Sequence, residues 1–177
     1  GWWKITNGQV DFGYVGYEQN GSNWWYVYGG QVCFQATDVL PGTVGGQYGW
    51  WKVCEGKVNF DDDVCENTYG WWKITTGKAD FQYTGLAQNA CGWWMIQNGH
   101  VNFGSNGLVD NGNGWWLVRN GGVDFNYNGL VDNGNGWWLI RNGYVDFNYN
   151  GLVDNGNGWW LVKNGCVDFS YQGYVQN

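Results

Sequence analysis

Apolar and polar residues alternate on both sides of an Asn-Gly pair in WWLVRNGGVDF, residues 115–125. Such alternation is typical of β-strands with one buried face, because successive side chains of a strand point to opposite sides. Asn-Gly between two such runs favours a two-residue type I′ turn, which needs positive φ at both central residues. No stretch of the chain shows a helical period. The pattern therefore predicts an all-β protein built from hairpins.

The two-residue turn also fixes the register of each predicted hairpin. Counting the glycine before the tryptophan pair as the first place, the turn glycine occupies the eighth place. Places 3, 5, 10 and 12 then share one face, which holds Trp116, Val118, Val123 and Phe125. Places 2, 4, 6, 9 and 11 share the other face, which holds Trp115, Leu117, Arg119, Gly122 and Asp124. We therefore expect the second tryptophan of a pair in the core, opposite Phe, and the first on an outer face.

This hairpin pattern recurs along the whole chain, with spacings of 21 to 26 residues between unit starts. The predicted units are residues 1–22, 23–48, 49–69, 70–91, 92–113, 114–135, 136–157 and 158–177. They account for all 16 Trp and all 8 Phe, and each Phe is at the twelfth place. Each unit ends in a Gly- and Asn-rich tail, which we expect to be a connection whose one apolar anchor docks between hairpins. Because each unit of a repeat protein buries its apolar face against its neighbours, we predict one module, 1–177: a solenoid of stacked β-hairpins with eight repeats.

The composition narrows the classes of partner. The formal net charge is −7, which disfavours nucleic-acid binding and simple attraction to anionic membranes or anionic wall polymers. No apolar run approaches the length of a membrane span. The chain opens in the middle of the pattern, on Gly1-Trp2-Trp3, and shows no signal peptide. We therefore expect a mature fragment or a module cut from a longer protein.

Residue types that carry catalysis or bind metals lack the necessary spacing. The lone His100 has no metal-spaced partner, and DNGNG at Asp110 has Gly112 where a calcium loop needs an oxygen ligand. The acidic run 61–66 is interpreted as a polar loop. Near-identical units also lack the unique, asymmetric residues that catalysis needs. We therefore expect no enzyme activity, no cofactor and no metal site.

The aspartate at the eleventh place is expected to form cross-strand ion pairs rather than a site. Asp11 and Asp80 face Lys4 and Lys73 in the predicted register, whereas three other aspartates have a cation at the diagonal place. These diagonal pairs are Asp124 with Arg119, Asp146 with Arg141, and Asp168 with Lys163. Such pairs contribute only about 0.2–1 kcal/mol each.

The stretches GWWKITNGQVDF and NYNGLVDN resemble the cell-wall-binding repeats of Gram-positive bacteria, which are related to choline-binding and glucan-binding repeats. The variant is similar to repeats on secreted proteins of gut Firmicutes. The resemblance implies a solenoid of β-hairpins that attaches a secreted or surface protein noncovalently to wall polymers or glycans. In choline-binding members, the ligand cage uses the Trp after the first Gly of a unit together with aromatic residues of the second strand and of the next unit. The second strands here read VDF or VNF instead of Trp-Tyr-Tyr, so the resemblance does not extend to choline itself.

The candidate ligand-binding residues follow from the outer-face assignment and from this resemblance. They are Trp2, Trp24, Trp50, Trp71, Trp93, Trp115, Trp137 and Trp159, with Tyr127 and Tyr149 in addition. An outward Trp can stack on a sugar ring or hold a cation over its ring, but it can equally pack against the next tail. Both alternatives stay open at the level of sequence.

Five cysteines leave at least one thiol without a partner in the chain. An extracellular setting permits disulfides, and cysteines at similar levels of adjacent units can approach. We predict Cys33 paired with Cys54 and Cys65 paired with Cys91, with Cys166 free. The alternative, five unpaired thiols, stays open.

The sequence thus predicts a non-enzymatic, extracellular module that binds a cell-wall polymer or glycan in grooves between repeats. Repetition would raise its avidity without new contacts. The alternative is a structural spacer or self-associating scaffold without a small ligand, since an exposed row of tryptophans also suits side-by-side packing.

Overall fold

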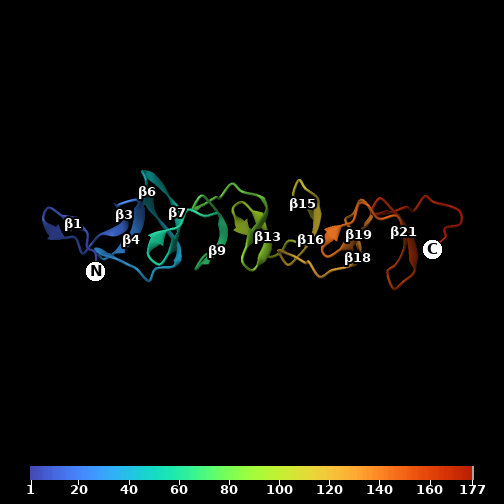
Figure 1. The fold of residues 1–177 in the computed structure, drawn as a ribbon, viewed down its shortest axis with the longest axis horizontal. Helices are drawn as coiled ribbons and strands as arrows, with labels where there is room; N and C mark the ends of the chain where they lie inside the picture. Colours follow the sequence, from blue (N-terminus) through green and yellow to red (C-terminus); the bar gives the residue numbers. More distant parts are fainter. Residues whose placement is uncertain (177) are drawn as a thin grey trace. The chain divides into compact units, whose positions relative to one another are not determined.

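The computed structural model describes residues 1–176, which form short antiparallel β-strands joined by turns (Figure 1). No helix occurs among these described residues, and none of their segments could therefore cross a bilayer as a helix. The predicted all-β class, a solenoid of stacked hairpins, is confirmed. The strands belong to two compact units, which are described separately: residues 1–91 with 96–101, and residues 92–95 with the chain from Asn102 onward.

The strands of the first unit are β1 (Ile5–Thr6), β2 (Gln9–Val10), β3 (Val15–Asn20), β4 (Asn23–Tyr28), β5 (Gln31–Val32), β6 (Asp38–Val44), β7 (Gln47–Cys54), β8 (Lys57–Val58), β9 (Asp63–Asn67), β10 (Gly70–Thr75), β11 (Lys78–Ala79), β12 (Gly85–Asn89) and β14 (His100–Val101). Strand β13 (Gly92–Gln97) contributes residues to both units. The strands of the second unit are β15 (Gly107–Asp110), β16 (Trp115–Arg119), β17 (Gly122–Val123), β18 (Gly129–Asp132), β19 (Trp137–Arg141), β20 (Tyr144–Val145), β21 (Gly151–Asp154), β22 (Trp159–Lys163) and β23 (Cys166–Val167).

The hairpin turns lie where the sequence places them. At Asn120-Gly121, the φ angles are 49° and 80°, as a type I′ turn requires. The register is also as predicted, since Val118 pairs with Val123 across this turn. Positive φ recurs at the other predicted turns: Asn7-Gly8, Gly29-Gly30, Glu55-Gly56, Thr76-Gly77, Asn98-Gly99, Asn142-Gly143 and Asn164-Gly165.

Consecutive repeats are joined through their backbones. The N–H of Leu117, at the fourth place, donates a hydrogen bond of 2.8 Å to the carbonyl of Gly143, the turn glycine of the next repeat. The same glycine lies against the preceding repeat, because a Cβ on Gly143 would be 2.5 Å from the carbonyl oxygen of Asp124. The turn glycine is thus needed both for its positive φ and for the close approach of two repeats.

The tails differ from the prediction, because they form strands rather than loop connections. Strand β15 pairs with β16 of the following repeat, with Leu108 opposite Leu117. A turn closes this second hairpin, where the N–H of Asn111 donates to the carbonyl of Gly114 at 3.1 Å. The four-residue tail strand is paired only with the next repeat, so its pattern is not visible within one unit.

The tail strands also change which side chains are buried. Leu117 and Leu139, predicted on the outer face, are buried because the tail strand covers them. The core consists mainly of places 5 and 10, for example Ile140 and Val145, which are fully buried. The Phe at the twelfth place was expected in the core, yet seven of the eight are exposed by 41–69%; Phe147 is half-buried.

Most apolar anchors of the tails dock as expected, but one does not. Tyr17, Leu86 and Leu130 are buried, and Leu108 and Leu152 are half-buried. Tyr174 is fully exposed, and its tail pairs with no strand among the described residues.

Candidate functional site: aromatic trios between consecutive repeats

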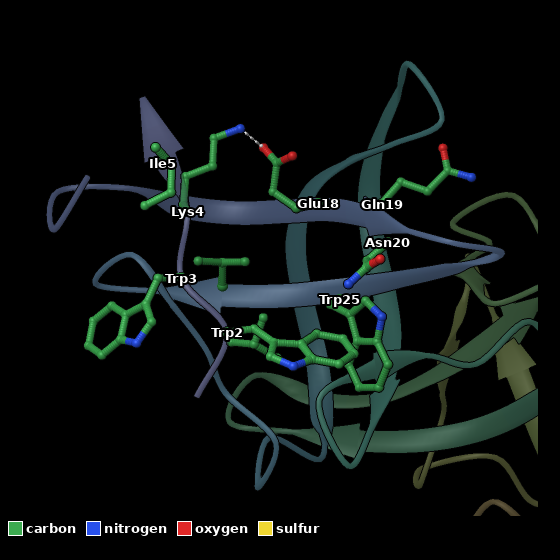
Figure 2. A pocket seen from close by; sticks show the side chains of 10 residues that line it. Trp2, Trp3, Lys4, Ile5, Glu18, Gln19, Asn20 and Trp25 are labelled. Carbon is green, nitrogen blue, oxygen red and sulfur yellow. Dashed lines mark hydrogen bonds and ion pairs between the residues drawn. The ribbon is translucent and has the colours of Figure 1, made fainter. Parts of the chain in front are cut away.

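Three aromatic rings from two consecutive repeats meet at Trp2, Trp25 and Phe34. The ring centroid distances are 5.2 Å for Trp2–Trp25, 5.6 Å for Trp2–Phe34 and 5.5 Å for Trp25–Phe34. All three contacts are edge-to-face, with interplanar angles of 71–75°, an arrangement that the ring quadrupoles favour. Figure 2 shows Trp2 beside Trp25, with Trp3 apart from both.

The same set, the first Trp of one repeat with the second Trp and the Phe of the next, recurs among the described residues. We call each set an aromatic trio; further trios are Trp50 with Trp72 and Phe81, and Trp115 with Trp138 and Phe147. Their centroid distances are 5.3–6.2 Å. Rings this close touch one another, so a ligand would lie on their exposed faces and edges.

One cavity opens beside the trio at Trp2, and another opens beside aromatic residues outside these trios. A cavity of about 250 Å³ is lined by Trp2 and Trp25, with the Lys4–Glu18 ion pair of 2.6 Å at its side (Figure 2). A second cavity, of about 380 Å³, is lined by Trp24, Trp51, Phe60 and Lys78, among others. Polar and aromatic groups together are the usual lining of sites for small ligands.

The burial of the tryptophan pairs follows the prediction in three repeats. Trp137 and Trp159 are exposed by 37% and 61%, whereas their neighbours Trp138 and Trp160 are half-buried. Trp51 is buried at 5% exposure and Trp50 is half-buried. In the first pair, both tryptophans are exposed to nearly the same degree, 46% and 45%, and in the other four pairs both are half-buried.

Sequence reasoning selected one member of each trio and missed two. The first tryptophans Trp2, Trp50 and Trp115 lie in trios, and Trp24 lines the second cavity. Trp71 and Trp93 are half-buried. The second Trp and the Phe were assigned to the core because the register places them opposite each other within one repeat. That assignment could not reveal their contact with the preceding repeat.

Tyr127 and Tyr149, the other two candidates, make internal contacts in the structure. The guanidinium carbons of Arg119 and Arg141 lie 4.2 and 4.5 Å from the centroids of these rings. The hydroxyl of Tyr127 donates to the carbonyl of Leu130 at 3.1 Å, and Tyr149 makes the equivalent bond. One face of each ring is therefore covered by a cation of the same repeat.

The predicted diagonal ion pairs are confirmed. They are Arg119–Asp124 at 3.2 Å, Arg141–Asp146 at 3.3 Å and Lys163–Asp168 at 2.7 Å. The hydrogen bonds from Lys163 and then from Ser170 lower the pKa of Asp168 to about 2.

Asp11 and Asp80 face Lys4 and Lys73 as predicted, since the N–H of each aspartate donates to the carbonyl of the facing lysine at 2.9 Å. The ion pairs expected between these facing residues are wrong. Lys4 bonds Glu18 at 2.6 Å, and Lys73 lies 3.4 Å from Asp62. Asp11 instead accepts hydrogen bonds from the backbone of Gly13 and from Thr6. The lysines reach acidic groups on neighbouring segments, because their long side chains extend past the facing aspartate.

All five cysteines are free thiols in the structure, so the predicted pairs Cys33–Cys54 and Cys65–Cys91 are not formed. Cys65 instead shares a cavity with Cys54 and with the Lys52–Asp63 ion pair, whereas Cys91 lies exposed beyond the end of β12. Burial raises the pKa of the Cys65 thiol to about 12. The tail strand β9 places Cys65 against the preceding hairpin, which the prediction of a loop did not anticipate.

The described residues contain no group of three or more His, Cys, Asp or Glu arranged to hold a metal ion. His100 lies with its ring 5.7 Å from that of Trp72, and its Nδ1 is 3.0 Å from the carbonyl oxygen of Val101.

Four consecutive segments of the sequence match one family model, described as the choline-binding repeat: residues 82–102, 104–124, 126–146 and 148–168. Together they cover just under half of the chain. No protein of curated function is similar enough to this sequence to match it.

Several solved structures are similar to this chain at low identity. Choline binding protein F from Streptococcus pneumoniae, crystal form II, is 20% identical, with a TM-score of 0.39, over 93% of this chain and 55% of that protein. The same protein in the presence of a peptidoglycan analogue is 17% identical, with a TM-score of 0.34, over 88% of this chain and 52% of that protein. The modular Cpl-1 endolysin complexed with a peptidoglycan analogue is 18% identical, with a TM-score of 0.30, over 92% and 40% of the two chains. This chain thus spans about half the length of the structures that it matches.

Proposed function

We propose that this chain, whose residues 82–168 carry repeats of the choline-binding repeat family, is a cell-wall-binding module. Its ligand would be a quaternary-ammonium group of the choline type, borne by a wall polymer and held at the aromatic trios. Its place would be the surface of a Gram-positive cell, or a protein secreted by one. The module itself would bind and not catalyse.

One observation carries this proposal: the aromatic trio, whose rings meet edge-to-face or tilted, is built from two consecutive repeats and recurs along the chain. Aromatic faces attract cations through the ring quadrupole, and this attraction is the usual means of recognising quaternary ammonium groups. The net charge of −7 adds a field that favours a cationic ligand. A neutral sugar would gain from stacking but not from this field.

The strength of such binding depends on repetition. A cation over an exposed ring gains only about 0.5–1 kcal/mol per contact, so a single trio binds weakly. A polymer that carries many copies of the group can occupy several trios at once, and linked binding of this kind raises avidity by about 10²–10⁴.

The ligand-binding candidates under this proposal are the eight first tryptophans, Trp2, Trp24, Trp50, Trp71, Trp93, Trp115, Trp137 and Trp159. The second Trp and the Phe of the following repeat would complete the site in each trio. We assign Tyr127 and Tyr149 a supporting role, because an arginine already covers one face of each ring.

The proposal is tested by retention of the whole chain on purified walls that carry or lack choline. We expect retention on choline-bearing walls only, and elution by free choline. Trp115→Ala, which removes one ring of a trio, should weaken retention several-fold. Tyr28→Ala is the matched control, since Tyr28 is exposed but belongs to no trio.

Three outcomes would count against the proposal. Equal retention on both kinds of wall, with elution by soluble sugar fragments alone, would favour a glycan ligand. Equal loss in the two variants would remove the role of the trio. Assembly that rises with protein concentration, without any response to choline or sugars, would favour the structural spacer or self-associating scaffold.

A further inference from the structure

From the second repeat onward, the ninth place of a repeat lies against the second tryptophan of the preceding repeat. The backbone pairs are Trp3 with Gln31, Trp25 with Lys57, Trp51 with Lys78, Trp72 with His100, Trp94 with Gly122, Trp116 with Tyr144, and Trp138 with Cys166. One partner is always Trp, whereas the other is Gln, Lys, His, Gly, Tyr or Cys. The residue beside the second tryptophan therefore changes from repeat to repeat while the tryptophan itself stays constant.

Lys78 places its own positive charge on one of these tryptophans. Its ammonium nitrogen is 5.9 Å from the centroid of the Trp51 ring, within the range of a cation–π contact. Its side chain crosses Gly49, where an added Cβ would be 2.5 Å from Cδ of the lysine. Lys78 also lines the cavity of about 380 Å³ that Trp24, Trp51 and Phe60 share. A charge of this chain thus occupies the position that a cationic ligand would need.

Tyr144, three repeats after Lys78, has the opposite effect. Its ring lies 5.0 Å from that of Trp116, at an interplanar angle of 63°, and Phe125 lies 5.7 Å from Trp116 on the same indole. The tyrosine ring crosses Gly114, where any Cβ would overlap it. Tyr144 therefore adds an aromatic ring where Lys78 adds a charge.

Lys57 shows that the residue type alone does not decide the contact. Lys57 is the ninth residue of its repeat, as Lys78 is of the next one, and its backbone pairs with that of Trp25. Lys57 is exposed, however, and does not line the cavity beside Trp25. The first place of the preceding repeat here is Asn23 rather than Gly. A side chain at that place leaves no bare backbone for the lysine to cross, so Lys57 and Lys78 form a natural matched pair.

We propose that the side chain at the ninth place selects which aromatic sites accept a cationic ligand. Lys78 excludes the cation from the site at Trp51, and Tyr144 strengthens the site at Trp116. This inference rests on the proposed function, because it assumes that the aromatic sites bind a quaternary ammonium group.

The test uses the full chain labelled with 5-fluorotryptophan and followed by fluorine NMR. The resonances of Trp51, Trp25 and Trp116 are assigned by single Trp→Phe changes. Choline chloride is the cationic probe, and 3,3-dimethylbutan-1-ol, which has the same shape without charge, is the neutral probe. Circular dichroism and thermal unfolding confirm that each variant folds.

Lys78→Met should raise the affinity of choline at Trp51 about tenfold, because the competing charge is removed while the length of the side chain is kept. The neutral probe should bind Trp51 equally in the variant and the parent chain. Lys57→Met should leave choline binding at Trp25 unchanged. Tyr144→Ala should weaken choline at Trp116 several-fold, and Tyr144→Phe should restore it.

The failures of the two proposals are distinguishable. If choline shifts resonances of the parent chain, but Lys78→Met leaves Trp51 and Tyr144→Ala leaves Trp116 unchanged, selection by the ninth place is wrong while cation binding stands. An equal gain for the neutral probe in Lys78→Met would show that bulk rather than charge blocks the site, which also overturns the inference. If no resonance of the parent chain responds to choline, both proposals fall.

Discussion

Replacing the turn glycine Gly143 by alanine tests whether the repeats are held together by close backbone contact. Gly143 has a φ of 76°, and an added Cβ would lie 2.5 Å from the carbonyl oxygen of Asp124 and 2.9 Å from Cα of Phe125. Gly134 provides the matched control. Its φ is 84°, but nothing lies within 4 Å of an added Cβ.

The two substitutions share one cost and differ in another. Alanine in the left-handed region costs about 1–2 kcal/mol at either position, and the effect on the unfolded chain is the same. Gly143→Ala must also push two repeats apart, and overpacking of this kind costs about 1–3 kcal/mol. We therefore expect a loss of about 1–2 kcal/mol for Gly134→Ala and of about 2–5 kcal/mol for Gly143→Ala.

Urea unfolding followed by tryptophan fluorescence measures both losses. An unchanged slope of the unfolding free energy against urea concentration shows that both variants expose the same surface on unfolding and can be compared. The informative quantity is the difference between the two variants, about 1–3 kcal/mol. If the two variants lose the same free energy of unfolding, the close approach at the turn glycine contributes nothing to the stacking of repeats, and the reasoning is refuted.

The remaining predictions concern single side chains. Trp116→Ala should lower the free energy of unfolding by about 3–5 kcal/mol. Trp137→Ala, at a site exposed by 37%, should reduce wall retention with a smaller loss of unfolding free energy. An equal loss of unfolding free energy in the two variants would contradict the outer position of Trp137. Burial is the largest single influence and alone would raise the pKa of Asp63, but the hydrogen bonds from Lys52 and from the backbone of Val64, together with the charge of Lys52, outweigh it and lower the pKa below 3.8. The stability from this pair should therefore be present above pH 3.8 and be lost as the pH falls through the lower, folded pKa; thermal midpoints that match those of Asp63→Asn at every pH would argue against it. Iodoacetamide at about pH 8 should alkylate exposed Cys91 before Cys65, because the thiolate is the reactive form and burial raises the pKa of Cys65 to about 12; similar rates would disprove this order.

The hairpins were predictable because their information is local. Asn120-Gly121 determines the turn, and the turn determines that Val118 faces Val123. The tail strands were not predictable, because the GLVD segment pairs with a strand of the next repeat. In isolation, its two central apolar residues look like the anchor of a loop. The burial of Leu117 follows from that pairing and was missed with it.

The candidate site was predictable in part for the same reason. The outer position of Trp137 and Trp159 follows from alternation along one strand. The trio also needs a Trp and a Phe from the following repeat, and their approach depends on how far the solenoid advances from one repeat to the next. The hydrophobic pattern contains no measure of that advance.

Besides the apolar core and the aromatic contacts, consecutive repeats are joined through backbone atoms that every residue shares. The N–H at the fourth place bonds the carbonyl at the eighth, as in Leu117 to Gly143, and the turn glycine touches bare backbone. Because none of these backbone contacts involves the side chain at the ninth place, that residue can change without loss of the stack. Evolution of a repeat protein can therefore vary Lys78 or Tyr144 at little cost to the fold. The side chains at the ninth place, which differ between repeats, lie directly beside the second tryptophans, which stay the same. A change at this place therefore alters ligand binding more than it alters the stack.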